Sequence, residues 1–243
     1  MLVGILSLEP KVFYLAALQL FFLISIPVFS FSALTNWISN KFGKKIQTWR
    51  SDLPEITREA FGTARAIFVV SFLAAWPVSL SRLGYETGLV WTVEEMGVSW
   101  WMVVLQMYFG IVAIDAWTYW KHRLLHTKWM YPFHMHHHTF KDPTPFAGFA
   151  VGPVETVLTF WPLLLIYIPE AKHFAPFYYT AISLFVLLNL YLHSGVTFKV
   201  LEKILPKLLL NSSAWHNIHH SDVIVNFGEV SFFWDKLCKT NKN

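Results

Sequence analysis

The sequence is poor in charged residues and in cysteine, and its first half has no histidine. Of its 243 residues only 14% are Asp, Glu, Lys or Arg, whereas an average soluble domain has about 25%. The single cysteine, Cys238, has no intrachain disulfide partner and cannot form an iron–sulfur cysteine pattern. No dinucleotide-binding glycine fingerprint occurs either. These absences exclude a disulfide-stabilised scaffold and any redox cofactor held by such motifs.

The sequence is instead rich in apolar residues. The chain is 55% hydrophobic and 18% aromatic, and its mean hydropathy is +0.43. This content excludes an intrinsically disordered chain and indicates that lipid surrounds much of the protein. The net charge of +4 and pI of about 9.1 are modest. We therefore expect no nucleic-acid partner, and we interpret the basic residues as signals of membrane topology.

Five apolar runs are candidates for membrane spans, since a helix needs roughly 20 apolar residues to cross a bilayer. The runs cover residues 12–34, 67–80, 99–120, 146–168 and 175–193. The second is short and contains Pro77, which predicts a tilted or partly re-entrant segment. Pro153 and Pro162 predict a bend or break in the fourth. We expect an all-α integral membrane protein with four to five transmembrane helices and a cytoplasmic helical cap that carries the histidines.

Basic residues are concentrated on one side of these spans. The loop between the first two spans holds six of them, whereas the next loop holds Arg82 against three glutamates. The positive-inside rule then places residues 35–66, 122–144 and those after 193 in the cytoplasm. No internal repeat or flexible linker is apparent. We expect one domain over residues 1–243, with membrane helices in 1–98 and the histidine-bearing region in 99–240.

Histidine is the second unusual feature of the sequence. All eleven histidines lie at or after His122, and six of them lie in residues 122–138. Helical spacing puts the members of each cluster on one face, as an i, i+4 pair and then two i, i+3, i+4 triplets. A further histidine closes the last span. His136 points away from its cluster and His173 stands alone, so we assign neither to a site. The nine candidate metal ligands are His122, His126, His134, His137, His138, His193, His216, His219 and His220.

Nine ligands exceed what one metal ion accepts. Zinc takes three or four protein ligands and octahedral iron at most six, so the set predicts a dinuclear site. Imidazole alone does not select the metal, because it suits zinc, copper, iron and nickel. Four other polar residues are candidates to orient the ligands: Asp115, Glu155, Asn189 and Asp222. For each, the alternative interpretation is a helix-packing contact or, for Asp222, simple solvation. Asp235 is a weaker candidate of the same kind.

The order of these motifs resembles the membrane fatty acid hydroxylase and sterol desaturase superfamily. The resemblance covers residues from about 100 to 240. It rests on the three histidine clusters and on a set of flanking residues. These are Asp115, the run 119–126, Pro153-Val-Glu155, Asn189, His193-Ser-Gly195, Asn226-Phe-Gly228 and Trp234-Asp235. The resemblance implies a non-haem di-iron oxygenase that uses O2 and two electrons to hydroxylate or desaturate a lipid, hydroxylation being the preferred expectation. Zinc can take the iron positions in purified protein.

The same resemblance implies partners outside the chain. The substrate is a lipid in the bilayer, such as a sterol, fatty acyl chain, sphingoid base, alkylglycerol or carotenoid. A separate cytoplasmic electron donor, either cytochrome b5-like or a ferredoxin with its reductase, would dock on the basic loops. The membrane is a bacterial inner membrane or the endoplasmic reticulum. Two alternative functions remain at this point: a zinc-dependent intramembrane lipid amidase or hydrolase, and a metal transporter.

Overall fold

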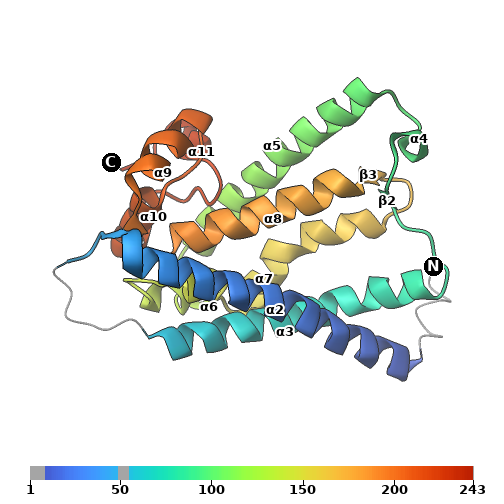
Figure 1. The fold of residues 1–243 in the computed structure, drawn as a ribbon, viewed down its shortest axis with the longest axis horizontal. Helices are drawn as coiled ribbons and strands as arrows, with labels where there is room; N and C mark the ends of the chain where they lie inside the picture. The colour runs from blue at the N-terminus through green and yellow to red at the C-terminus, as the bar shows by residue number, and fades with distance from the viewer. Residues whose placement is uncertain (1–8, 49–54, 243) are drawn as a thin grey trace.

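Four long helices form the body of the protein in the computed structural model, which describes residues 9–48 and 55–242. They are α2 (Pro10–Phe42), α3 (Ile56–Arg82), α5 (Trp100–Leu125) and α8 (Ala175–Leu192). In Figure 1, α2, α3 and α8 run along the long axis, and α5 diverges from them toward one end. All four are long and apolar enough to cross a bilayer. The chain is therefore a mostly helical, multi-pass membrane protein, as predicted.

Helix α3 is longer than the apolar run that predicted it. The run at 67–80 was expected to cross only in part, but the helix begins at Ile56 and has 27 residues, with Pro77 inside it. Its first two turns carry charged residues, which ended the apolar run. One of them, Glu59, is 1% exposed, and its carboxylate accepts hydrogen bonds from the backbone N–H and the hydroxyl of Thr144. Charge near a helix end thus concealed about three turns of α3.

The run at 146–168 is not one helix, which corrects the prediction of a possible fifth span. It divides into the 3-10 turn η2 (Pro145–Ala147), helix α7 (Pro153–Phe160) and the 3-10 helix η3 (Trp161–Tyr167). Pro153 starts α7, where its missing N–H costs nothing. Pro162 lies at the start of η3, where the helix tightens. The continuous helical part, Pro153–Tyr167, is shorter than a membrane-spanning helix.

Short elements connect and cap the long helices. Strand β1 (Lys44–Lys45) pairs antiparallel with β4 (Val196–Thr197), which joins the end of α2 to the chain after α8. At the other end β2 (Leu89–Val90) pairs parallel with β3 (His173–Phe174). The remaining elements are α4 (Val93–Met96), α6 (Tyr131–His134), η1 (His137–Thr139), α9 (Lys199–Ile204), η4 (Leu205–Leu208), α10 (Ser213–Asp222) and α11 (Phe233–Cys238).

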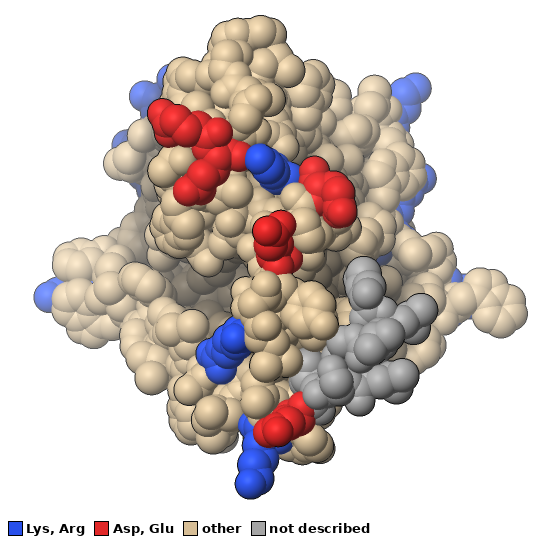
Figure 2. All heavy atoms as spheres, turned by 90° about the vertical axis from the view of Figure 1, so that its right-hand side faces the viewer, with Lys and Arg blue, Asp and Glu red and all other residues tan. Residues whose placement is uncertain are grey.

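The buried apolar core is small and lies where α2, α3 and α8 meet the turn that precedes α7. Its buried members are Val28, Ile67, Phe149 and Leu190. Gly62 allows the close approach of α3 to this turn, because a Cβ there would lie 2.9 Å from the Cβ of Ala150. The short elements α6, α9, α10 and α11 form a cap at one end of the bundle (Figure 1). Figure 2 views the opposite end, where acidic side chains gather.

Candidate metal centre

The cap end of the bundle brings all nine predicted ligands together. The end of α5 contributes His122 and the residue that follows the helix, His126. Elements α6 and η1 contribute the second cluster, α10 contributes the third, and His193 caps α8. Eight of the nine imidazoles are buried, and His126 is half-buried. Buried histidines at this density require a chemical explanation, because an imidazole without a partner is costly to bury.

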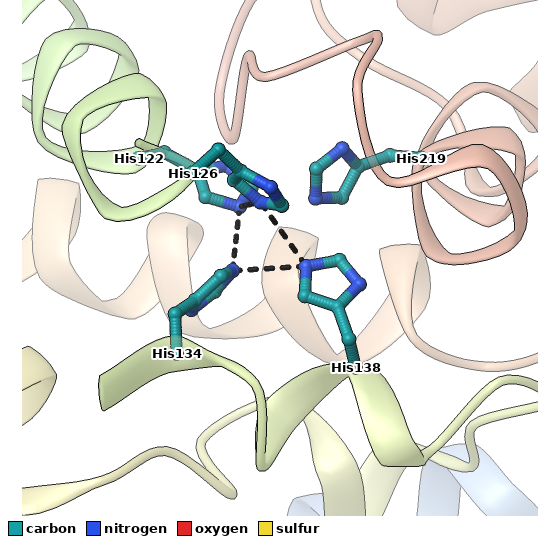
Figure 3. Close-up of side chains that lie close together, drawn as sticks. All are labelled: His122, His126, His134, His138 and His219. Carbon is teal, nitrogen blue, oxygen red and sulfur yellow. Dashed lines mark hydrogen bonds between the residues drawn. The ribbon is translucent and has the colours of Figure 1, made fainter. Parts of the chain in front are cut away.

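The nine histidines divide into two groups. Within each group, one ring nitrogen from every member lies within 4.8 Å of the others. Figure 3 shows the first group, in which five imidazoles from three segments point toward a common centre. The first group is His122, His126, His134, His138 and His219. The second group is His137, His193, His216 and His220. The groups adjoin, since the ring centroids of His138 and His220 are 5.2 Å apart.

Hydrogen bonds fix the tautomer of four of these imidazoles. In each case Nδ1–H donates to an oxygen outside the cluster, which leaves the lone pair on Nε2. For His122, His193 and His219 the assignment follows from the partner, because a backbone carbonyl can only accept; for His134 it holds when the Glu155 carboxyl is ionised. The bonds are His122 to Phe227 O at 2.8 Å, His134 to Glu155 Oε2 at 2.7 Å, His193 to Asn189 O at 2.9 Å and His219 to Val225 O at 2.7 Å.

The Nε2 atoms of these imidazoles lie within hydrogen-bond distance of the Nε2 atoms of other histidines. In the first group the Nε2 of His134 lies 3.1 Å from that of His122 and 2.9 Å from that of His138. In the second group the Nε2 of His193 lies 3.0 Å from that of His216. His122 and His134 both present a lone pair at their contact, which is repulsive unless a cation lies between them. The donor set therefore fits metal ions.

Unpaired buried nitrogens support the same conclusion. The Nε2 of His219 and both ring nitrogens of His220 have no hydrogen-bond partner among the residues that the structure describes, although both residues are fully buried. Each such atom costs about 1–3 kcal/mol when it stays unsatisfied, and a metal–nitrogen bond removes that cost. Burial lowers the pKa of His193 and of His219 to about 4. These imidazoles are thus neutral at pH 7, the form that a metal ion binds.

Glu155 lies against the first group. Its carboxylate is the partner of His134 Nδ1 at 2.7 Å, and the residue is 2% exposed. Burial raises the pKa of this carboxyl to about 8, and a bound cation favours the ionised form of a nearby carboxyl. In the metal-loaded protein Glu155 therefore accepts from His134 and holds that imidazole in its ligating tautomer.

The other three residues predicted to orient ligands are placed differently. Asp115 contacts no histidine among the described residues, and its carboxylate instead accepts from the backbone and hydroxyl of Ser231 and from the indole of Trp234. The side chain of Asn189 does not bind an imidazole, although its backbone carbonyl holds His193. Asp222 pairs with Lys242 at the surface. Interhelical packing explains Asp115, and solvation explains Asp222.

The C-terminal segment 223–242, which we call the strap, holds imidazoles in a way that the sequence did not predict. Its backbone carbonyls at Val225 and Phe227 hold His219 and His122 in the first group. Asp235 anchors the strap by accepting from the N–H groups of Phe227 and Gly228, at 2.9 and 2.8 Å. Asn226 adopts a positive φ of 57°, a conformation that asparagine tolerates better than most residues. The Asn226-Phe-Gly228 and Trp234-Asp235 motifs are the sequence signals that lie in the strap.

A buried ion pair was also missed. The ammonium of Lys121 lies 2.7 Å from Glu229 of the strap and donates to the hydroxyl of Thr159 at 3.2 Å. Lys121 is 3% exposed, so its ammonium group is removed from solvent and paired. The pair joins α5, α7 and the strap at the edge of the first histidine group.

His136 and His173 lie outside both groups, as expected. His136 is partly exposed, and its ring packs against Phe140 at a centroid distance of 5.4 Å. His173 lies in β3 at the opposite end of the bundle (Figure 1). Neither belongs to a group of potential ligands among the residues that the structure describes.

A small cavity of about 30 Å³ adjoins the histidines. Aromatic side chains of Phe149, Phe160 and Phe185 line one part of it, and His137 and His193 line another. The volume holds a water molecule but no lipid. A lipid tail would therefore need these aromatic side chains to move before it could approach the metal site.

Fold and site together define a class: a multi-pass membrane protein with two adjoining histidine groups suited to metal binding at one end of its helices. Comparison with known proteins agrees with this class. The family model described as fatty acid hydroxylase matches residues 107–240, more than half of the chain. The chain belongs to the fatty acid hydroxylase family.

Curated relatives match a longer part of the chain. A lathosterol oxidase of Homo sapiens is 29% identical over 78% of this chain and 62% of its own length. A Delta(7)-sterol 5(6)-desaturase of Gibberella zeae is 27% identical over 75% of this chain and 50% of its own length. A Delta(7)-sterol 5(6)-desaturase of Leptosphaeria maculans is 30% identical over 71% of this chain and 45% of its own length. The chain thus spans about half to three fifths of these relatives. No solved structure matches it.

Proposed function

We propose that this protein is a membrane-bound lipid C–H oxygenase that holds two iron ions in its two histidine groups. The observation that carries the proposal is the convergence of nine imidazoles, most of them neutral and buried, at the end of four apolar helices. The ligand set does not distinguish iron from zinc. Family membership favours iron, because fatty acid hydroxylation requires a redox-active centre.

The iron pair would activate O2. The residues around the histidines orient the imidazoles and line the adjoining cavity. Glu155 holds the proton on His134 Nδ1, and the strap carbonyls hold those of His122 and His219. These contacts keep the Nε2 lone pairs directed at the metal sites. The phenylalanines of the cavity limit its volume to about one water molecule and present an apolar surface to a lipid tail.

Hydroxylation is the reaction we propose first. One oxygen atom of O2 enters the C–H bond and the other leaves as water, with two electrons and two protons supplied from outside the chain. Desaturation would instead remove two hydrogens from the lipid and release both oxygen atoms as water. The names of the relatives refer to lathosterol and to Delta(7)-sterols. A Delta(7)-sterol is therefore the first substrate to assay, followed by fatty acyl lipids.

We further propose that the histidine site faces the cytoplasm, of a bacterial cell or beside the endoplasmic reticulum. Basic residues at the cap end and acidic residues at the other end support this orientation under the positive-inside rule. Two electrons must then come from a cytoplasmic donor, cytochrome b5-like or a ferredoxin with its reductase. Exposed cap lysines such as Lys128 and Lys236 offer such an acidic protein a docking charge.

The two alternative functions fit the geometry less well. A zinc-dependent lipid amidase or hydrolase needs three ligands and a water molecule, which leaves about half of this set unexplained. A metal transporter places its ligands along a path near the bilayer midplane, whereas His122, His126 and His193 lie at the ends of α5 and α8.

Oxygen dependence tests the proposal. The iron-loaded protein, reconstituted in liposomes with a reductase system and lathosterol or a fatty acyl lipid, should form an oxidised lipid in air and none under argon. The His137→Ala variant in the same vesicles is the control for non-enzymatic oxidation. Product formed without O2 or reductant would contradict an oxygenase and favour the hydrolase. Lipid profiles of cells that express either form would then identify the natural substrate.

A further inference from the structure

An open groove lies between the end of α2 and the start of α9, outside the histidine site. Its volume is about 520 Å³. Nothing in the proposed oxygenase chemistry uses it. The groove is lined from α2 and β1 by Ile38, Phe42 and Lys44, and from β4 and the segment that follows it by Thr197, Phe198, Lys199, Val200 and Leu201.

The two walls of the groove are held together by backbone contacts. Strand β1 pairs with β4, with Lys44 opposite Thr197, and the Thr197 hydroxyl donates to the Lys44 carbonyl at 3.3 Å. Gly43 permits this approach, because a Cβ there would lie 2.5 Å from a methyl group of Val196. The groove is therefore a fixed feature at the end of a membrane-spanning helix.

Its lining combines apolar side chains with two cations. Phe42 and Val200 are 62% and 64% exposed, so much apolar surface stays uncovered. Lys44 and Lys199 are the charged residues of the lining, and no carboxylate from the described part of the chain belongs to it. The acid nearest in sequence, Glu202, accepts a hydrogen bond from the Tyr191 hydroxyl instead. The two ammonium groups are thus available to an anionic ligand.

The surroundings place this groove at the edge of the bilayer. The ammonium of Lys41 lies 5.0 Å from the Trp37 ring and 5.2 Å from the Phe42 ring. Tryptophan and lysine beside each other at a helix end are typical of the membrane–water boundary. On the other wall, apolar and basic residues recur every four positions. The exposed apolar ones are Val200, Ile204 and Leu208, and the basic ones are Lys199, Lys203 and Lys207.

We propose that this groove binds one anionic phospholipid. The phosphate lies with Lys44 and Lys199, and an acyl chain follows Ile38 and Phe42 along α2. Lysine is a compact point charge suited to a phosphate, and the apolar wall gives the acyl chain a surface that a free anion would not need. A zwitterionic phospholipid, which has no net charge, binds more weakly at the same place.

Native mass spectrometry of the metal-loaded full chain tests the proposal. The protein in neutral detergent is titrated with phosphatidylglycerol, phosphatidylcholine or inorganic phosphate. We expect one phosphatidylglycerol adduct, and about tenfold weaker binding of that lipid by the double variant K44Q/K199Q. The matched control K128Q/K236Q removes the same charge from exposed cap positions and should bind like the wild type. Iron content and elution volume verify that each variant is folded, and the single variants replace the double one if it is not.

Four results would overturn the phospholipid site. They are unchanged phosphatidylglycerol binding by K44Q/K199Q, an equal loss in the control variant, equal affinity of the wild type for phosphatidylcholine, and displacement of the lipid by inorganic phosphate at matched concentration. The first two would show that these lysines do not form the site. The last two would show that net lipid charge, or the acyl chain, does not contribute to binding.

Discussion

At the scale of single residues, the outward hydrogen bonds of four histidine Nδ1 atoms set the orientation of their rings in the site. Four imidazoles donate outward, to Glu155, to the backbone carbonyl of Asn189 and to two strap carbonyls. Their Nε2 lone pairs are left to face inward. The proposed metal binding would thus rely on the acceptors outside the cluster as well as on the histidines.

Removing one ligand from each group tests the division into two sites. His219→Ala should empty the first site and His137→Ala the second, so each variant should retain about half of the wild-type iron and no oxygenase activity. His136→Ala is the matched control, because it changes the neighbour of His137 without touching either group. Metal analysis of the purified variants provides the measurement. Full iron content in His219→Ala or His137→Ala would show that the residue is not a ligand.

Glu155 offers a second test at this scale. Glu155→Gln keeps the size of the side chain but lets it present an amide N–H to His134, which no longer fixes the ligating tautomer. We expect iron affinity to fall about 10- to 100-fold, the usual effect of losing such a partner. Competition with a chelator measures the affinity. Glu94→Gln, at the exposed start of α4, is the control, and equal affinities for the two variants would contradict the role given to Glu155.

Helical periodicity predicted which histidines are candidate ligands, but not how they divide into two groups. The i, i+3, i+4 spacing puts His134, His137 and His138 on one face, yet the structure assigns His137 to the second group and the other two to the first. The chain tightens from α6 to the 3-10 helix η1 after His134, which turns neighbouring side chains apart. The sequence does not specify which element faces each imidazole, so the partition could not be predicted.

At the scale of elements, the strap is the part of the site that sequence reasoning missed. Backbone carbonyls there orient two of the candidate ligands. Every residue has a backbone carbonyl, so the sequence does not show which of them accepts a hydrogen bond from a histidine. Asp115 was expected beside an imidazole because it lies two helical turns before His122. It instead holds Ser231 and Trp234 and so fixes the strap against α5. Its influence on the metal site is indirect.

Asp115→Asn should therefore loosen the strap. Loss of the charged acceptor weakens three hydrogen bonds at once, and we expect faster proteolysis within residues 223–242 and weaker iron binding in the first site than in the second. Limited proteolysis with metal analysis measures both effects. Glu94→Gln is the control, since Glu94 lies at the exposed start of α4 at the opposite end of the bundle (Figure 1). Wild-type protease resistance in Asp115→Asn would contradict this role.

At the scale of the whole molecule, the histidines lie at the cap end of an apolar bundle, and acidic side chains gather on the surface of the opposite end. Composition alone predicted a membrane protein with its histidines on one side. The number of spans required the structure, because Glu59 hides the start of α3 and two prolines divide the run at 146–168. Buried imidazoles at one end also make the folded state sensitive to pH.

The metal-free protein should lose stability as the pH falls from about 6.5 to about 4. The pKa of His193 and His219 is lowered to about 4 in the folded protein, against about 6.5 in an unfolded chain. Between these values the unfolded state binds protons that the folded state does not, so each residue removes about 2 kcal/mol at pH 5. Thermal unfolding of chelator-treated protein at pH 7 and pH 5 measures the effect. His193→Gln/His219→Gln should show a smaller change, and a pH-independent midpoint in the wild type would contradict the burial of neutral imidazoles.

The account depends most directly on the presence of two metal sites. Purified full-length protein, loaded with ferrous iron under argon and freed of excess metal, should contain two iron ions per chain by elemental analysis. Two adjoining imidazole groups with inward lone pairs require that number. A saturated content of fewer than two metal ions per chain would contradict the dinuclear centre and, with it, the proposed oxygenase.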